Sequence, residues 1–541
     1  MVTALIGGCG LFGASDPAQA PPAVDGSDAG GDGAGNQAVG GPAADFALSI
    51  DPVAAPLAVV PGASATLKLT IKRGKALVDP VVITVTGLRD GIAAAPLTIA
   101  TGESGDLVIS APAAAPQGAV MGVIEAVSGT VKATTPLSAL VRGKPGDVDT
   151  TYAGGTGTVN GLFGTGNDGR VVDMLLAPDD SVYVVGRCPG LTSHACVVHV
   201  AADGTPDKAY GTAGLAELTF QDPHAAALQP DGKLIVVGGF SPAYTVMGRL
   251  DATGKPDTAF GDNSVGPGTI QFSTGGLSGQ AHGAYGVALR ADGDVFVTWD
   301  NFDTGPGVYK NAISHFGPNG LVRTTFGANG AARSGFGLTT AVAVRNDPAD
   351  PSHGNFLLFW ENTGGTSGTG TASYLQVTGD TNAVDPAFGA GIKSISIAGI
   401  RRPDTGQIGL VQLADRSVIT AFQGDSGLYA YKVAPTFDGD ATFGAVGLAG
   451  PYVINGSASG IAVQPDGAVL IALNHEGGHE VMRLTDKGAL DTTFGQTGHA
   501  TTLVGTNSAA NKVVVQKTGR ILVAGSRLAP GFDGAIVSFW P

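Results

Sequence analysis

Two short phrases alternate along residues 152–519, and their recurrence constrains the fold more than any other feature of this chain. The first is a hairpin phrase of the Pro-Asp-Gly type that precedes an apolar run; it is clearest at 229–232 and 464–467 and weaker at 177–180, 290–293, 351–354, 413–416 and 516–519. The second is an aromatic residue followed by glycine, at Tyr152 (with one residue inserted before Gly154), Tyr210, Phe260, Phe326, Phe388, Phe443 and Phe494. A period of this size indicates a propeller, a solenoid or an array.

Each repeat is written for β-strands rather than helices. Short β-rich runs bounded by Gly, Pro or Asp lie between the phrases, for example 224–229, 233–240, 244–250 and 269–273. In the hairpin phrase Pro presets φ, Asp bonds its own backbone and Gly takes the left-handed conformation. The aromatic residue supplies one large apolar side chain per repeat, which we expect to pack between neighbouring sheets. Four strands in each of seven repeats predict an all-β, seven-bladed β-propeller; a solenoid is the alternative.

The phase of the repeats predicts how the ring closes. If the strand before each hairpin is innermost, as in WD-repeat propellers, the last repeat ends at its third strand, 535–540. The run 157–163 lies before the first hairpin and can supply the missing strand. We therefore expect these two runs to pair in one blade. A solenoid would not need such a pairing between its first and last strands.

The second repeat carries a family resemblance. Residues 228–239 read Leu-Gln-Pro-Asp-Gly-Lys-Leu-Ile-Val-Val-Gly-Gly, and residues 249–261 read Arg-Leu-Asp-Ala-Thr-Gly-Lys-Pro-Asp-Thr-Ala-Phe-Gly. They resemble the delta-60 repeat of bacterial envelope and secreted proteins, and the likeness covers most of 145–541. The middle repeats depart from the pattern, because Arg323 replaces the turn Asp and Asp415-Arg416 replaces Asp-Gly. The resemblance implies a propeller-like fold at the cell surface and implies no reaction.

The composition fits an exported, loop-rich β protein of more than one domain. Among 541 residues there are 86 Gly and 32 Pro, only 14% are charged, and the net charge is −15. Such a negative field repels phosphate, so nucleic acid is a poor partner. No apolar run approaches the length of a membrane span.

The first nine residues resemble the end of a bacterial lipoprotein signal, in which aliphatic and small residues precede a lipidated Cys. Here Leu5-Ile6-Gly7-Gly8 precede Cys9. Residues 10–43 are rich in Gly, Ala, Pro and Asp, so we expect 1–43 to be a signal remnant and a disordered tether. The start lacks a basic region, and its apolar stretch is short for export. A start codon placed too far downstream would explain both departures. The alternative is that Cys9 occurs by chance in a flexible terminus.

Residues 44–143 are expected to form a separate small sandwich. Apolar and polar residues alternate at 45–50, 61–71, 81–88 and 119–127, with turn residues between them. The pattern resembles the immunoglobulin-like modules of bacterial surface proteins, but the Cys-Trp-Cys core of that fold is lacking. We expect this module to act as a spacer before the propeller at 144–541.

The two cysteines other than Cys9 flank the loop 189–195 of the first propeller repeat. Facing positions across a hairpin can meet disulfide geometry, and an oxidising compartment would let the bond form. We therefore predict a bond between Cys188 and Cys196, with two buried free thiols as the alternative.

One string matches a catalytic motif without its structural context. Residues 475–479 read His-Glu-Gly-Gly-His, the zinc-protease pattern, which needs both His on one face of a helix. Two glycines at its centre and a predicted hairpin loop argue against a helix. We expect no metal and no catalytic residue here.

Two adjacent repeats carry an aromatic, an acid and an amide at the end of the second strand. They are Trp299, Asp300 and Asn301 in one repeat and Trp360, Glu361 and Asn362 in the next. Indole faces with acids and amides suit sugar binding, and two carboxylates could do glycosidic acid and base work. We expect these residues to gather with His282 and Tyr285, from the loop 273–285, on one partly exposed rim. The alternative is that each Trp fills a gap in its blade.

Two classes of function follow. We expect a monomeric lipoprotein of the bacterial outer membrane or cell surface that needs no cofactor and binds a surface glycan or a protein without catalysis. Its only contact with the membrane would be the lipid anchor. The alternative is a propeller-type polysaccharide hydrolase or lyase that uses Asp300 and Glu361.

Overall fold

The computed structural model describes residues 47–541 apart from fourteen internal segments. These are 52–55, 165–168, 189–193, 240–244, 273–279, 304–307, 337, 345–355, 363–368, 378–392, 399–408, 437, 476 and 530–532. In parts of several strands, among them 301–303 and 356–362, only the backbone is described. The predicted tether and Cys9 therefore lie outside the described residues. The chain divides between Gly143 and Lys144 into two compact units. Among the described residues, no helix has the length and apolar character needed to cross a membrane.

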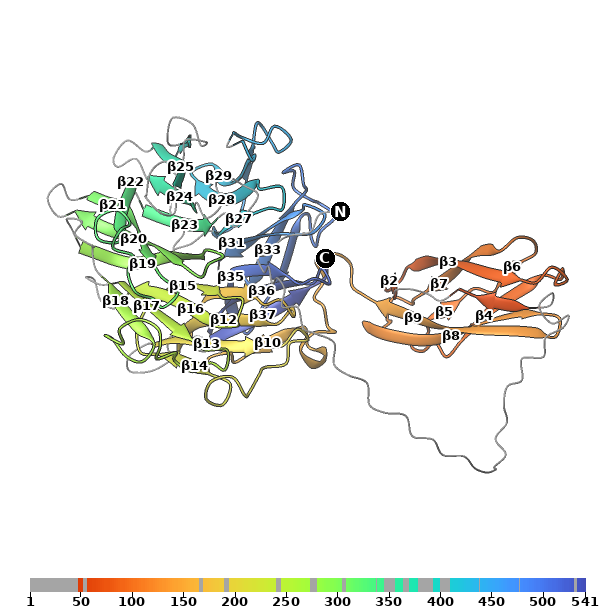
Figure 1. The fold of residues 1–541 in the computed structure, drawn as a ribbon. Helices are drawn as coiled ribbons and strands as arrows, with labels where there is room; N and C mark the ends of the chain where they lie inside the picture. Colours follow the sequence, from red (N-terminus) through yellow and green to blue (C-terminus); the bar gives the residue numbers. More distant parts are fainter. Residues whose placement is uncertain are drawn as a thin grey trace, which may run out of the picture. The chain divides into compact units, whose positions relative to one another are not determined.

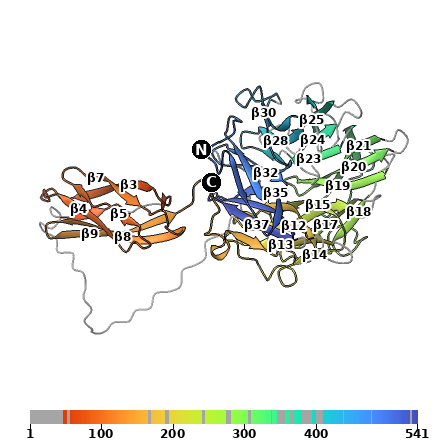
Figure 2. The same cartoon turned by 180° about the vertical axis from the view of Figure 1, so that it is seen from behind.

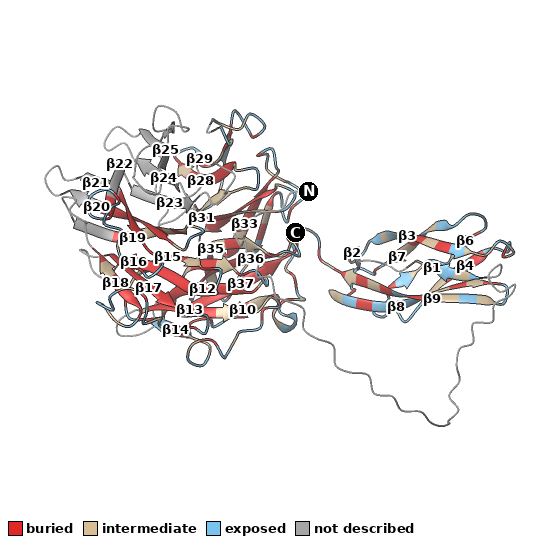
Figure 3. Ribbon diagram, in the orientation of Figure 1, coloured by how far each residue is buried: buried red, intermediate tan, exposed pale blue. Residues whose placement is uncertain are grey.

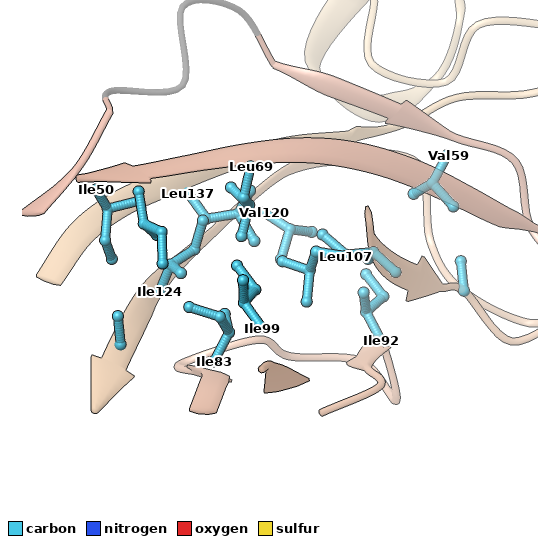
Figure 4. Close-up of a cluster of buried hydrophobic side chains, with 14 of the residues drawn as sticks. Ile50, Val59, Leu69, Ile83, Ile92, Ile99, Leu107, Val120, Ile124 and Leu137 are labelled. Carbon is cyan, nitrogen blue, oxygen red and sulfur yellow. The ribbon is translucent and has the colours of Figure 1, made fainter. Parts of the chain in front are cut away.

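The smaller unit is a pair of β-sheets. Its strands are β1 (Leu48–Ile50), β2 (Leu57–Val59), β3 (Ser64–Arg73), β4 (Val81–Thr86), β5 (Ala93–Ala94), β6 (Leu97–Ile99), β7 (Ser104–Ser110), β8 (Gly118–Ser128) and β9 (Val131–Val141). One sheet has the order β1-β3-β7-β5 and the other β2-β9-β8-β4-β6. Because side chains alternate across each strand, one face of each sheet supplies the shared core, in which Leu107 of β7 packs with Ile124 of β8 (Figure 4).

In the described part of the larger unit, the strands form seven four-stranded sheets. Five of them, in chain order, are β11 (Val171–Leu176), β12 (Val182–Cys188), β13 (His194–Val200) and β14 (Ala216–Leu218); β15 (Pro223–Leu228), β16 (Leu234–Gly239), β17 (Thr245–Leu250) and β18 (Thr269–Phe272); β19 (Gln280–Leu289), β20 (Val295–Asp303), β21 (Val308–Phe316) and β22 (Ala331–Phe336); β23 (Leu338–Val344), β24 (Phe356–Asn362), β25 (Thr369–Val377) and β26 (Lys393–Ala398); and β27 (Leu410–Gln412), β28 (Val418–Gly424), β29 (Gly427–Val433) and β30 (Leu448–Tyr452). Each is an antiparallel meander.

The last two sheets complete the unit. They are β31 (Ser457–Val463), β32 (Val469–Asn474), β33 (His479–Leu484) and β34 (His499–Thr502); and β35 (Asn507–Val515), β36 (Ile521–Ala529), β37 (Asp533–Phe539) and β10 (Thr158–Asn160). A short 3-10 turn, η2 (Ala153–Gly155), precedes β10. The first strands of successive sheets contact one another in chain order, and β35 contacts β11, so the sheets form a ring. This is a β-propeller, in which the first sheet lies beside the last (Figures 1 and 2).

The ring closes as the phase of the repeats predicts. β10 pairs antiparallel with β37, with Thr158 opposite Val537 and Asn160 opposite Ala535. The run 157–163 thus supplies the outer strand of the C-terminal sheet, and that prediction is confirmed. The pairing covers an edge of β37 that would otherwise be free.

The aromatic residues of the second phrase pack as expected. Six of them lie in the described part of the chain, and all six are buried: Tyr152, Tyr210, Phe260, Phe326, Phe443 and Phe494. The following glycine often joins two sheets, as where the amide of Gly261 donates to the carbonyl of Asn319 in the next sheet at 2.8 Å. A Cβ on Gly320 would come within 2.8 Å of the Phe260 ring, so this glycine is required by a close approach. Among the described residues, the strands β12, β16, β17, β32 and β37 consist mostly of buried residues (Figure 3).

Candidate functional site

A polar cluster is buried in the sheets between the hairpin phrase and the aromatic-glycine turn; we call it the turn cluster. In sheet β15–β18 its centre is Arg249 of β17. The guanidinium donates to Asp257 Oδ2 at 3.0 Å, to Gln229 Oε1 at 3.4 Å and to the carbonyl of Pro318 in the next sheet at 2.7 Å. It also lies 4.3 Å from the centre of the Phe260 ring. One guanidinium therefore holds together the turn, the hairpin and the neighbouring sheet.

Two other sheets place a guanidinium in the same position. In sheet β31–β34, Arg483 donates to Asp491 at 2.8 Å and to Gln464 at 3.5 Å, and lies 4.4 Å from the Phe494 ring centre. Burial alone would raise the pKa of the Asp491 carboxyl, but the hydrogen bonds from Thr493 and the charge of Arg483 lower it below its usual value.

The C-terminal sheet reaches the same arrangement from a different sequence position. Arg520, immediately before β36, donates to Asp149 Oδ2 at 2.6 Å, to Gln516 at 3.4 Å and to the carbonyl of Ala202 in the next sheet at 3.3 Å. Its guanidinium lies 5.4 Å from the Tyr152 ring centre. The position in the fold, rather than the position in the repeat, therefore selects the guanidinium.

Two further sheets fill the turn cluster with stacked rings. His199 stacks on Tyr183 at 4.5 Å and bonds Asp207 at 2.9 Å. His315 stacks on Phe296 at 4.3 Å in sheet β19–β22.

In that sheet Arg323 replaces the turn Asp, and the acid is supplied instead by Asp294, immediately before β20. The Asp294 carboxylate bonds His315 at 2.7 Å and Arg323 at 2.9 Å. The departure of this repeat from the family pattern is thus a relocation of the carboxylate within the same cluster.

Sheet β27–β30 has neither filling, and a cavity of about 500 Å³ lies between it and sheet β31–β34. Lys432 stands where the others have Arg249 or Arg483, and it pairs with Asp440 at 2.8 Å. Leu413 stands at the position of Gln229, and Ile419 at that of Tyr183 and Phe296. The shorter base, the missing amide and the missing ring together leave the space open.

The cavity is lined by groups of both charges. Its polar lining consists of Asp415, Lys432, Thr442, Asp466, Asp486 and Lys487, and Phe443 and Val463 contribute to its apolar wall. Burial acts to raise the pKa of Asp440, but hydrogen bonds from Lys432 and Thr442 outweigh it and lower that pKa to about 2. Lys432 therefore faces a permanent carboxylate.

A second group of polar side chains lies on the innermost strands. In β11, β15, β19, β23, β31 and β35 the register shifts at the same point, which is the mark of a β-bulge. His224 of β15 and Tyr285 of β19 occupy two of these bulges, and their rings stack at 4.5 Å. The expectation that 273–285 is a loop is therefore wrong for its last part, because β19 begins at Gln280.

The predicted exposed rim is wrong for Trp299 and Asp300. Trp299 is fully buried in the core between sheets β15–β18 and β19–β22, and its Nε1 donates to Ser314 Oγ at 3.0 Å. Asp300 is also buried. The indole fills a gap in the packing, which was the alternative interpretation. The side chains of Asn301, Trp360, Glu361, Asn362 and His282 lie outside the described residues.

The remaining candidates are placed as follows. Cys188 and Cys196 are bonded across the ends of β12 and β13, with Cα atoms 5.7 Å apart. The two His of the zinc-protease string have different surroundings. His475 bonds Glu480 at 2.6 Å, and Glu480 also bonds His499 at 2.7 Å, whereas His479 is fully buried. No group of three or more His, Cys, Asp or Glu in the described part of the chain is placed to hold a metal ion.

Sequence reasoning missed the cavity and the stacked pair. An alignment of the repeats places Leu413 with Gln229, Gln464 and Gln516, and places Lys432 with Arg249 and Arg483, so part of this signal was available. The partner of Tyr285 carried no such signal, because His224 meets it only through contact between sheets.

Comparisons with known proteins agree with a propeller over one repeat and assign no activity. Residues 229–260 match a family described as "Domain of unknown function (DUF5122) beta-propeller". The search of curated proteins found no match. Three solved structures are similar in outline. A quinonprotein alcohol dehydrogenase-like protein from Bacteroides thetaiotaomicron has 10% sequence identity and a TM-score of 0.34, with 90% of this chain and 91% of that chain covered. The β-propeller domain of the trilobed protease from Pyrococcus furiosus has 8% identity and a TM-score of 0.36, with 69% and 94% of the two chains covered, and an α-L-arabinofuranosidase from Fusarium graminearum has 11% identity and a TM-score of 0.33, with 70% and 98% covered. Similarity at this level transfers no function.

Proposed function

We propose that this chain is an extracytoplasmic seven-bladed propeller that binds a ligand without transforming it. Each four-stranded sheet of 144–541 is one blade, and the 44–143 unit is an immunoglobulin-like spacer. The observation that carries the proposal is the open cavity beside Lys432: the corresponding spaces of five other sheets are filled by the protein's own side chains. Where the corresponding described positions are filled, an unfilled polar cavity is typical of a ligand site.

The location follows from the sequence and from the cysteine pair. The stretch before Cys9 has the character of a lipoprotein signal, and a bond between Cys188 and Cys196 suits an oxidising compartment. We propose that lipid on Cys9 is the only membrane contact and that the protein is a monomer at the outer membrane or cell surface.

Labelled fatty acid tests the anchor. Expressed from an in-frame upstream start, the protein should take up the label, and Cys9→Ser should abolish uptake. Label that persists in the Cys9→Ser variant would overturn the anchor and leave the binding function untouched.

The alternative function, a polysaccharide hydrolase or lyase, needs a pair of carboxylates that reach the substrate. Asp300 is 1% exposed, which supports binding over this use of Asp300 with Glu361. A surface glycan or a protein is the class of ligand that we propose; nucleic acid is disfavoured by the net charge of −15.

A binding screen on the full chain tests the proposal. Immobilised protein is exposed to a glycan array and to cell-surface extracts, and release of reducing sugar is followed in parallel. We expect retention of a ligand without sugar release. Sugar release that Glu361→Gln abolishes would favour the enzyme, and failure to retain any ligand would overturn the binding function.

A further inference from the structure

We propose that the cavity between sheets β27–β30 and β31–β34 is a binding site for a guanidinium group, carried by a small molecule or by an arginine side chain. The inference rests on the proposed binding function and names the chemistry of its ligand. It starts from the other sheets, which show what this position in the fold accepts.

Three sheets place a guanidinium at the corresponding position, although the arginine comes from two different points of the repeat. Arg249, Arg483 and Arg520 each bond the turn carboxylate and a hairpin glutamine, and each lies over the aromatic ring of the turn. The recurrence from different sequence positions shows that the surroundings, and not the local backbone, favour this group.

Part of the same surroundings lines the open cavity. Phe443 corresponds to Phe260 as the aromatic wall, and Asp486 corresponds to Pro318, whose backbone carbonyl accepts from Arg249. A guanidinium in the cavity would find a ring face, a backbone acceptor and the carboxylates of Asp415 and Asp466. These are the partners that a planar group with five donors needs.

The charge already present in the cavity permits a second cation. Lys432 is paired with Asp440 at 2.8 Å, and Lys487 lies 3.5 Å from Asp486. The carboxylates of Asp415 and Asp466 add two further negative charges to the lining. The lining as a whole is therefore negative.

Sheet β15–β18 gives a precedent for two cations at one carboxylate. Asp257 binds Arg249 at 2.9 Å and Lys233 at 3.3 Å. In sheet β27–β30 the residue at the position of Lys233 is Ser417, so Asp440 has one base fewer. A bound guanidinium would restore the number of cations.

The size of the cavity exceeds the guanidinium itself. A volume of about 500 Å³ has room for the aliphatic stem and for further atoms of the ligand. Leu413, Ile419 and Val463 provide an apolar wall for such a stem. Free arginine, agmatine and an arginine side chain of a peptide all satisfy these conditions.

Calorimetric titration of the full chain tests the inference. The probes are L-arginine, agmatine, and an end-blocked Gly-Arg-Gly peptide; L-citrulline, which has the same shape without the charge, is the control. We expect the guanidinium probes to bind at least about tenfold more tightly than citrulline, because charge-assisted hydrogen bonds are lost in the control. Tighter binding of the peptide than of arginine would identify a protein partner, and the reverse a small molecule.

A variant whose own side chains fill the cavity tests whether the ligand binds there. Leu413→Gln with Lys432→Arg restores the pair found in sheets β15–β18 and β31–β34, and should abolish arginine binding while the thermal midpoint is kept or raised. The matched control, Gln464→Leu with Arg483→Lys, makes the same change in reverse in sheet β31–β34 and should retain the original site. If the filled variant does not fold, Asp466→Asn at the exposed hairpin tip should weaken arginine binding severalfold.

Two outcomes overturn the inference in different ways. If citrulline binds as well as arginine, or if the filled variant still binds arginine, this cavity does not select guanidinium, and the proposed binding function stands on its own screen. If the guanidinium probes do not bind, the inference fails, and if the glycan and extract screen also retains nothing, both proposals fail.

Discussion

Asp173 of β11 and Lys512 of β35 form an ion pair of 3.5 Å between the first and the last of the innermost strands in chain order. The Asp173 carboxylate also accepts the amide of Ala226 on β15 at 3.0 Å and that of Met174 at 2.9 Å. One carboxylate thus joins three innermost strands at the point where the ring closes. Both side chains are nearly buried, so solvent screens the pair little.

We expect Asp173→Asn to destabilise the propeller unit by about 2–4 kcal/mol, because it leaves Lys512 without its charge partner in a mostly buried position. Lys512→Met should cost less, since Asp173 keeps its two amide donors. Urea unfolding measures both. The control is Lys72→Met, which breaks an exposed pair with Asp51 and should change stability by less than about 1 kcal/mol. Equal losses in all three variants would contradict a special role for Asp173.

Ring closure predicts the effect of a deletion. Removing residues 145–165 takes away β10 and leaves the backbone of β37 unpaired, so the unit should melt at a lower temperature and associate through the new edge. Calorimetry and light scattering measure the two effects. Removing residues 20–40, in the predicted tether, is the control and should do neither. A deleted protein that stays monomeric and equally stable would show that β10 is dispensable.

The buried imidazole of His479 is expected to make the folded propeller unit less stable in mild acid. Burial lowers the pKa of its imidazole from 6.5 to about 4, against weaker opposing contacts with the backbone of Ala535 and Gly525. Because the folded-state pKa is the lower one, protons bind preferentially to the unfolded chain. The stability attached to neutral His479 is complete above about pH 6.5 and is lost as the pH falls toward 4, by roughly 3 kcal/mol at most.

His479→Leu should remove this part of the pH dependence. Neither ring nitrogen of His479 makes a hydrogen bond of normal geometry with the described residues, so an apolar side chain leaves no partner unsatisfied. Chemical denaturation at pH 7.5, 5.5 and 4.5 gives the comparison. His475→Gln, at a partly exposed site, is the control. Identical pH profiles for the wild type and His479→Leu would show that His479 does not titrate on unfolding.

The backbone conformation of Arg416 indicates that replacing this residue by glycine should stabilise the protein. It has φ of 69° at the hairpin position where Gly467 has 90° and Gly232 has 82°. A left-handed conformation is unfavourable for a side chain of this kind, so Arg416→Gly should raise the stability by about 1 kcal/mol. Gly467→Ala should lower it by a similar amount. Thermal melting checks both signs, and a fall in stability for Arg416→Gly would show that the contacts of its side chain outweigh the backbone strain.

The strand pattern and the way the ring closes could be predicted from the sequence because both depend on local signals. Hairpin residues such as Asp231 and Gly232 set the turns, and the offset of the run 157–163 fixes which strand completes the last sheet. The once-per-repeat aromatic residue, such as Phe260, likewise indicates burial wherever the chain repeats itself. Repetition makes each local signal visible several times, which is why these predictions held.

The environment of single side chains was decided only by the tertiary structure. In the sequence, Trp299 and the acid and amide that follow it have the composition of a sugar-binding site. The indole is nevertheless buried, because Ser314 on the neighbouring strand and the core of the adjoining sheet enclose it. The cavity beside Lys432 is equally non-local, since it depends on which residues two sheets bring together. Periodicity fixes the direction in which a strand residue points, but whether it meets solvent, a partner or an empty space depends on side chains supplied by another part of the chain.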